Sequence, residues 1–324
     1  MKFIKAISGL IISFVLLYLV FKKISFTELL SYIKNVKIGY LIVALFIGFF
    51  LLLFRSYRWR LIIKEYKNFG IPIFFEATVL GLFFNTILPF RMGDLIQGYV
   101  LSKKTAIPKS LTFSSVLMER FVDLFPPVVF IIIGSFFIVL PGQVSLFLSS
   151  LLLFFLVFGF YFILKFKKIV ITTVNKLSTR IKLFQKINIF MKNFYIALEN
   201  FKDKFLLGKV FSLTFLLWIG YSFNMWLICL SLDINLPSIM SSFLVQAITS
   251  LSVVIPSSPG YIGSWEFMGM LALSIFNIEK TKAVAFSLLS HIIGILSVVI
   301  LGVIFVFKEL NLLNYFKQEV KNET

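Results

Sequence analysis

Long apolar runs, separated by short clusters of charged residues, make up most of the 324-residue sequence. The runs do not alternate apolar with polar positions, which is the pattern of strands in a membrane barrel. A helix that crosses a bilayer needs about 20 mostly apolar residues, so the chain has room for about six to eight. We therefore expect an all-α integral membrane protein. Helices in the membrane are predicted over residues 4–21, 38–54, 73–90, 110–140, 146–164, 210–232, 239–255 and 283–307.

Two of these helices end in clusters of residues that break a helix. The first cluster, in the sequence FFNTILPFRMGD, holds Pro89, Arg91, Gly93 and Asp94. Glycine lacks a Cβ and proline lacks an N–H, so both interrupt a helix. A broken backbone at membrane depth is tolerated where protein or a water-filled cavity covers it, and charges there mark functional sites. We therefore predict a site at this first break.

A short apolar stretch, residues 94–102, follows the first break and is too short to span a bilayer. Positive charge flanks the pair on both sides, because residues 55–67 precede it and Lys103, Lys104 and Lys109 follow it. Cytoplasmic flanks are rich in Lys and Arg, so an even number of crossings is needed. This favours a re-entrant hairpin that turns near residues 89–93, with one long kinked helix as the alternative.

The second break, PSSPGYIGSWE at residues 256–266, contains Gly260, Gly263 and Glu266 and precedes another short stretch, residues 267–276. It follows a loop that we expect outside the cell, so the second hairpin should enter from the opposite side. Paired broken segments of opposite orientation are the signature of an inverted-repeat transporter. The two turns would meet near the middle of the membrane, where the N-termini of the short legs favour an anion such as phosphate.

The predicted helix over residues 110–140 adds Glu119, Arg120 and Asp123. Arg120 and Asp123 are three residues apart and can pair, and these charges could also sit at the helix's cytoplasmic end for structure alone. Glu266 has no partner of opposite sign nearby in the sequence, so we expect it to pair with Arg91 or Arg120. The polar residues of both breaks should converge on one substrate-binding site: Asn85, Arg91, Gly93, Asp94, Glu119, Arg120, Asp123, Gly260, Gly263 and Glu266.

Half of the net charge of +18 lies in residues 165–209, where eleven Lys and Arg face Glu199 and Asp203, a net +9. Positively charged loops of membrane proteins stay in the cytoplasm. Apolar residues recur every three or four positions here, which predicts an amphipathic helix on the membrane surface. We expect this segment and both termini in the cytoplasm, and Gln143 and Asn235 outside. The positive charge thus indicates topology and anionic lipids as partners, and no nucleic acid.

Few residues are available for catalysis or for metal binding. Cys229 is the single cysteine and His291 the single histidine. This excludes a cysteine metal site, a histidine cluster and a catalytic triad that uses a second histidine. No P-loop, dinucleotide fingerprint or HExxH motif occurs. We therefore predict no catalytic residue, no metal and no cofactor.

Three motifs, NTILPFRMGD, MERFVD and PSSPGYIGSWE, resemble in this order those of the lysylphosphatidylglycerol synthase transmembrane-region family, also called flippase-like domain proteins. The resemblance covers nearly the whole chain and implies an inner or plasma membrane protein with about eight membrane segments, which the apolar length allows. In multidomain relatives this region is associated with flipping an aminoacylated phospholipid that a separate soluble domain makes.

Some positions of this chain differ from that family pattern. Asp94 stands where Glu is usual, Gln97 and Trp265 stand where basic residues are common, and His291 stands where the last helix often has Arg. We expect residues 1–324 to form a single transmembrane domain that acts without the soluble synthase domain.

The pattern favours a protein that moves an anionic or phosphate-bearing lipid, or a lipid-linked substrate, between leaflets. One alternative is a non-catalytic membrane partner that positions a lipid- or glycan-modifying enzyme. Another is an enzyme that modifies lipid headgroups with Asp94, Glu119, Asp123 and Glu266 as acids and bases. Transport is favoured because paired broken helices with buried charge suit it. The expected partners are membrane phospholipids, a lipid-linked substrate and a partner enzyme.

Overall fold

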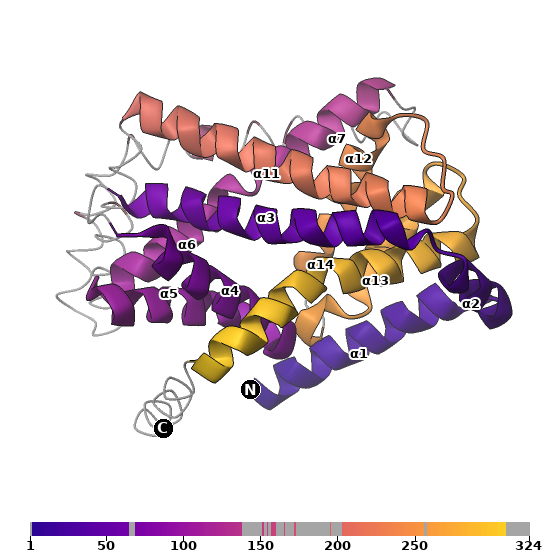
Figure 1. Ribbon diagram of the computed structural model, residues 1–324, viewed down its shortest axis with the longest axis horizontal. Coiled ribbons are helices and arrows are strands. Elements are labelled where there is room, and N and C mark those ends of the chain that lie inside the picture. The colour runs from indigo at the N-terminus through magenta and orange to yellow at the C-terminus, as the bar shows by residue number, and fades with distance from the viewer. Residues whose placement is uncertain are drawn as a thin grey trace.

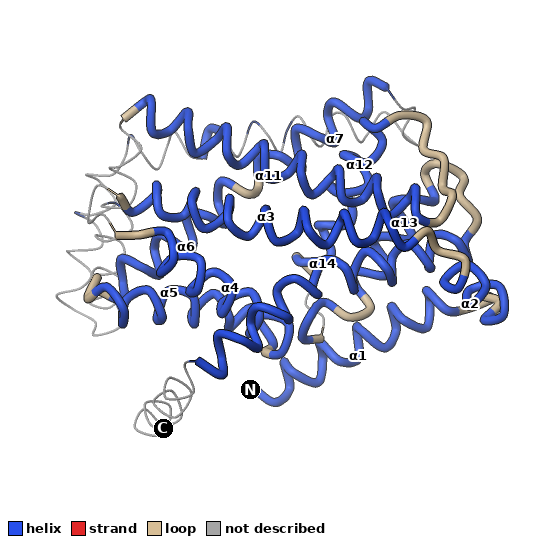
Figure 2. Tube along the Cα trace, in the orientation of Figure 1, coloured by secondary structure: helices blue, strands red, loops and turns tan. Residues whose placement is uncertain are grey.

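The computed structural model describes residues 2–64, 69–137, 203–255 and 258–308, together with residues 151, 154, 157–159, 165, 172 and 195. All regular secondary structure in these residues is helical, which confirms the predicted all-α class for the described chain (Figures 1 and 2). Three helices are long and apolar enough to cross a membrane: α3 (Ile38–Ile63), α11 (Lys204–Ser231) and α14 (Lys280–Lys308). A fourth candidate is the pair α1 (Lys2–Phe21) and α2 (Phe26–Lys34), which is bent by 86°.

The long helices α3 and α11 form the centre of the bundle. They run antiparallel, because the backbone N–H of Lys37, just before α3, donates to the carbonyl of Ser231 at the end of α11 (2.9 Å). α14 packs against both, and Figure 1 shows it crossing the bundle diagonally. The helix α2 was not predicted; it begins where the Ser25 hydroxyl accepts a hydrogen bond from the N–H of Glu28, an N-cap.

The first break produces a helical hairpin. α4 (Ile71–Ile87) is followed by the 3-10 turn η1 (Pro89–Arg91) and by α5 (Met92–Thr105), and α4 packs along α5. A Cβ on Gly93 would lie 2.0 Å from the carbonyl oxygen of Gly81, so the two legs approach as closely as backbone atoms allow. The chain therefore folds back here and does not continue as one kinked helix.

The second break has a similar course. α12 (Ile239–Ser250) passes through the 3-10 turn η3 (Leu251–Val253), and η4 (Pro259–Tyr261) leads into α13 (Ser264–Ser274), which packs against α12. Pro256 and Ser257 lie outside the described residues. α4 starts at the end of the bundle where α3 finishes, and α12 starts at the other end, where α11 finishes (Figure 1). The turns η1 and η4 contact each other between these ends.

The predicted helix over residues 110–140 is two helices, α6 (Lys109–Val122) and α7 (Phe125–Phe137). The break falls at Asp123 and Leu124, directly before Pro126 and Pro127, whose missing N–H groups cannot bond to the preceding turn. The predicted long element is therefore interrupted at the two prolines.

Other predicted segments are shorter here or are not described. Two shorter apolar helices, Ile71–Ile87 and Ile239–Val253, do not reach spanning length. Most of the predicted helix over residues 146–164 and nearly all of the amphipathic segment 165–209 lie outside the described residues. The last residues of that segment, from Lys204 onward, belong to α11.

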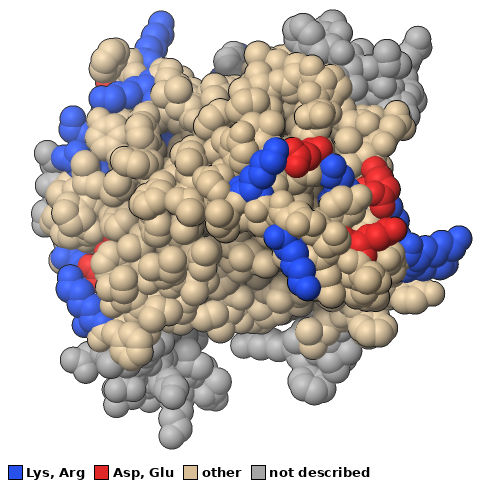
Figure 3. Space-filling model, turned by 45° about the vertical axis from the view of Figure 1, so that its right-hand side comes forward, with Lys and Arg blue, Asp and Glu red and all other residues tan. Residues whose placement is uncertain are grey.

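Charged side chains lie mainly towards the two ends of the described bundle. In the face shown in Figure 3, Lys, Arg, Asp and Glu gather in two groups with a band of other residues between them. At the end near α2, Lys37 forms an ion pair with Asp233, and Lys282 donates to the Asp233 carbonyl (2.9 Å). Tyr32 on α2 donates to the carboxylate of Glu279 (2.8 Å), so α2 is fastened to the start of α14.

Candidate functional site

Arg58 is at the centre of a buried network of ions. Its side chain is 0% exposed and leaves the C-terminal part of α3 towards α6. Its guanidinium donates to both carboxylate oxygens of Asp123 (2.6 and 3.1 Å), to Glu119 (3.1 Å) and to the hydroxyl of Thr214 (3.0 Å). Such bidentate pairing matches the planar fork of arginine.

Further side chains complete the surroundings of the two carboxylates. Gln97 on α5 donates to Glu119 (2.8 Å), and the indole N–H of Trp218 on α11 lies 3.4 Å from Asp123. Arg55, one helical turn before Arg58, has its Nη2 3.8 Å from the same Asp123 carboxylate. Four helices thus hold this cluster: α3, α5, α6 and α11.

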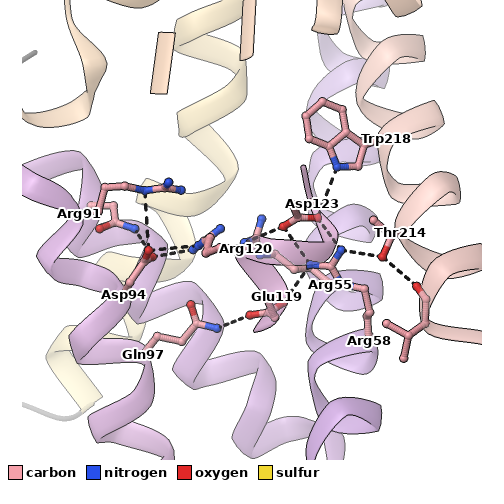
Figure 4. Close-up of polar contacts among 12 residues, drawn as sticks. Arg55, Arg58, Arg91, Asp94, Gln97, Glu119, Arg120, Asp123, Thr214 and Trp218 are labelled. Atoms are coloured by element: carbon pink, nitrogen blue, oxygen red, sulfur yellow. Dashed lines mark hydrogen bonds and ion pairs between the residues drawn. The ribbon is translucent and has the colours of Figure 1, made fainter. Parts of the chain in front are cut away.

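A second cluster surrounds Asp94 at the start of α5. Arg120 on α6 donates to both of its carboxylate oxygens (2.6 and 3.1 Å), and Asn85 on α4 donates to one of them (2.9 Å). Arg91 has its Nε 3.7 Å from Asp94. Figure 4 shows the two clusters side by side, with Arg120 and Arg55 between Asp94 and Asp123. α6 therefore connects them, because it supplies Glu119 and Asp123 to one and Arg120 to the other.

Among these residues the positive charges outnumber the negative ones. The guanidinium groups of Arg55, Arg58, Arg91 and Arg120 face the carboxylates of Asp94, Glu119 and Asp123, so four positive charges meet three negative ones. An unbalanced charge in a low-dielectric interior is costly and is offset when an ion of the opposite sign binds. The arrangement is therefore suited to an anion.

Two arginines of the network have guanidinium groups that are incompletely paired. Nε and Nη2 of Arg55 and Nε of Arg91 are buried and have no hydrogen-bond partner in the described chain. Buried N–H groups in native proteins nearly always have a partner, so each exception needs an explanation. Arg58 and Arg120, in contrast, donate to carboxylates at hydrogen-bond distance. Arg55 and Arg91 thus offer free donors in a network where Nε of Arg58, Oδ1 of Asn85 and Oε1 of Gln97 also lack a partner.

The backbone at the first break is strained. Phe90 and Arg91 both have left-handed conformations, with φ of 57° and 55°. For a residue with a Cβ this conformation costs about 1–2 kcal/mol. Strain of this kind persists where the surrounding structure imposes it, and it clusters at functional sites. Here it directs the Arg91 side chain, 37% exposed, back towards Asp94.

Glu266 does not reach the arginines, so the prediction that it pairs with Arg91 or Arg120 was wrong. Its carboxylate accepts the N–H of Gly263 (2.6 Å) and contacts Nδ1 of His291 on α14 (2.5 Å). The expected local pair of Arg120 with Asp123 is also absent from the described contacts, because Arg120 binds Asp94 and Asp123 binds Arg58.

The glycines of the second break allow this turn to form. Gly260 and Gly263 have φ of +69° and +89°, which side chains with a Cβ rarely adopt. A Cβ on Gly263 would lie 2.7 Å from the carbonyl oxygen of Ser13 on α1, and one on Gly260 would lie 3.1 Å from the carbonyl of Thr86 on α4. Gly260 therefore places the second turn against the first hairpin.

The predicted site residues thus fall into two groups. The network on α3–α6 brings together those of the first break and of α6: Asn85, Arg91, Gly93, Asp94, Glu119, Arg120 and Asp123. Gly260, Gly263 and Glu266 form a separate polar cluster with His291.

Sequence reasoning missed Arg55 and Arg58, because they resemble the positive flank that follows a spanning helix. α3 continues to Ile63 and buries both. The available signal was the apolar run Leu61, Ile62 and Ile63 directly after them, which showed that the helix had not ended.

These features define an all-helical integral membrane protein with a buried, arginine-rich polar network beside broken helices. The profile of the lysylphosphatidylglycerol synthase TM region matches residues 6–302, and the chain belongs to this family. The resemblance drawn from the three motifs is therefore confirmed.

Two similar proteins come from Methanocaldococcus jannaschii. UPF0104 membrane protein MJ1595 is 30% identical, with 94% of this chain and 94% of that protein covered. UPF0104 membrane protein MJ1078 is 28% identical, with 75% of this chain and 99% of that protein covered. No solved structure matches the chain.

Proposed function

We propose that the protein moves an anionic, phosphate-bearing lipid or lipid-linked substrate between the leaflets of a membrane. The observation that carries this proposal is the surplus of guanidinium groups in this network, with free N–H donors on buried Arg55 and on Arg91, whose side chain is 37% exposed. Phosphate suits these donors because its oxygens accept paired, parallel hydrogen bonds from a guanidinium.

The start of α5 favours the same type of ligand. The first N–H groups of a helix lack partners within the helix and lie at the positive end of its dipole. The side chain of Arg91, the N-cap residue of α5, makes no capping hydrogen bond. Asp94, in the first turn of α5, forms ion pairs with Arg120 and Arg91. A phosphate between Arg91 and this helix end would be bound by both.

The surroundings of the first break favour a lipid over a water-soluble anion. Large apolar side chains around Arg91 are exposed on the described chain, and lipid tails would cover them: Ile87, Phe90, Met92 and Leu95. A headgroup could therefore contact the arginines while its acyl chains remain in the bilayer beside α4 and α5. A soluble anion would gain nothing from this apolar margin.

We further propose that the two hairpins are re-entrant and form an inverted repeat within one domain of about eight membrane segments. The contact of η1 with η4, and the opposite ends from which the hairpins start, support this arrangement. In this proposal the protein lies in an inner or plasma membrane. Both termini are in the cytoplasm, and the end that holds α2 and Asp233 faces outward.

Reconstitution into liposomes tests the proposal. Fluorescent phosphatidylglycerol and fluorescent phosphatidylcholine are placed in separate preparations, and a membrane-impermeant quencher reports the fraction of each in the outer leaflet. We expect the protein to bring the anionic lipid from the inner leaflet into reach of the quencher faster than the zwitterionic lipid. Folded protein that moves neither lipid would contradict the proposal and would favour a role in positioning a partner enzyme.

A further inference from the structure

The cluster around His291 lies apart from the arginine network and has a property of its own. The ring of His291 lies between two oxygen atoms: Nδ1 is 2.5 Å from Oε1 of Glu266, and Nε2 is 2.8 Å from the carbonyl oxygen of Gly260. A carbonyl oxygen only accepts hydrogen bonds, so Nε2 must carry a hydrogen. In a neutral imidazole, Nδ1 then has a lone pair, which would face the carboxylate oxygens of an ionised Glu266.

One more proton removes this conflict. Either Nδ1 is protonated and donates to the carboxylate, or the carboxyl group is protonated and donates to Nδ1. In both cases a single proton lies between the two side chains, and the pair as a whole is neutral. The short contact and the burial of both residues, each below 10% exposed, require this proton in the conformation seen here.

We propose that Glu266 on α13 and His291 on α14 form a proton-binding site, and that the protonation of this pair controls the contact between the two hairpins. Nε2 of His291 donates a hydrogen bond to the carbonyl of Gly260, and Gly260 lies against Thr86 of the first hairpin. When the proton leaves, the lone pair of Nδ1 and the carboxylate repel each other, and the ring must turn away or change its tautomer. Either change weakens the hydrogen bond to Gly260, which places the second turn.

Within this cluster, the proton shared by Glu266 and His291 is the charge that can change with pH. The residue of α1 nearest to this turn is the neutral Ser13, whose hydroxyl accepts the N–H of Ser258. The helix α12 has no charged residue, and the Lys residues of α14 are at its two ends. The indole of Trp265 stacks on the His291 ring (5.5 Å, 23°) and donates to Ser290. The two turns that touch carry one titratable side chain each, Arg91 in η1 and Tyr261 in η4.

A direct measurement uses the fact that His291 is the only histidine of the chain. Full-length protein labelled with ¹⁵N-histidine gives one imidazole spectrum, which is followed from pH 5 to pH 9. We expect Nε2 to be protonated throughout and the Nδ1 signal to shift from the protonated to the unprotonated position as pH rises. A spectrum that does not change with pH, or an unprotonated Nε2, would overturn the proton site.

Two variants separate the pair from its surroundings. Glu266→Gln has nearly the same shape but has no carboxylate to share the proton, so the shift of the Nδ1 signal should be lost from the pH range of the unaltered chain. Ser297→Ala changes a buried side chain two turns away on the same helix and should leave the titration unchanged. An unchanged titration in Glu266→Gln would show that Glu266 does not share the proton.

The link between this proton and lipid movement rests on the proposed function, whereas the proton site itself does not. Liposome measurements at the same pH values should show a rate of lipid movement that changes over the range in which the Nδ1 signal shifts. In His291→Gln, which cannot bind a proton, the rate should be independent of pH. A titrating signal without lipid movement at any pH would leave the proton site and refute the proposed function. A titrating signal with a pH-independent rate would refute the link.

Discussion

Replacing Arg58 with methionine tests whether the buried network holds the bundle together. Methionine has a similar length but no charge, so the change leaves Asp123 and Glu119 buried without their main partner. Arg58 is 0% exposed and donates to both carboxylates and to Thr214, so solvent cannot replace these bonds. Removing one partner of a buried ion pair costs about 3–5 kcal/mol.

The free energy of unfolding in mixed micelles, measured by titration with a denaturing detergent, should fall by this amount. Lys64→Gln, at the exposed end of the same helix, is the matched control and should change stability by no more than about 0.5 kcal/mol. The double variant Arg58→Met with Asp123→Asn should lose about 0.5–3 kcal/mol less than the two single losses added together, because the residues act as a pair. A loss of less than about 1 kcal/mol in Arg58→Met, as for an exposed pair, would show that the buried network does not stabilise the bundle.

Three other changes have expected results. Gly93→Ala should reduce the yield of folded protein in size-exclusion chromatography, because its Cβ would collide with backbone of the adjacent leg, whereas Gly39→Ala, with open space around it, should not. Lys37→Met removes an exposed ion pair with Asp233 and should leave the midpoint of the same unfolding titration nearly unchanged; a clear shift would contradict its exposure. In a chain without its native cysteine, a cysteine at Asn235 should react with an impermeant reagent from outside intact cells and one at Lys176 should not, and the reverse pattern would refute the proposed topology.

The sequence predicted the all-α class of the described chain and the positions of the two breaks, because both depend on local properties. Apolar length sets where helices occur, and Pro89, Gly93 and Gly263 end or bend them whatever the tertiary structure. The hairpin at the first break also followed from charge on both flanks. The pairing of α6 residues was less predictable, because Arg120 pairs with Asp94 on another helix and not with Asp123 at the end of its own helix.

The errors share a physical origin, which is that partners of buried charges are set by packing between helices. Arg55 and Arg58 resembled a positive flank because residues near a helix end commonly face the cytoplasm, and their burial follows from α3 packing on α11 and α6. His291 could not be matched to Glu266 from spacing, because 25 residues and a turn separate them. The helix α2 was missed because it is too short to form a long apolar run in the sequence.

The measurement that tests the central claim most directly is lipid movement in liposomes by the Arg91 variants. Arg91 supplies an Nε–H without a hydrogen-bond partner at the strained first break, so it should contact the headgroup. Arg91→Ala should abolish movement of fluorescent phosphatidylglycerol, while its elution volume and thermal stability in detergent stay close to those of the unaltered protein. Arg91→Lys should restore part of the rate, because lysine keeps the charge but loses the planar fork. A folded Arg91→Ala variant that moves this lipid at the rate of the unaltered chain would contradict the account.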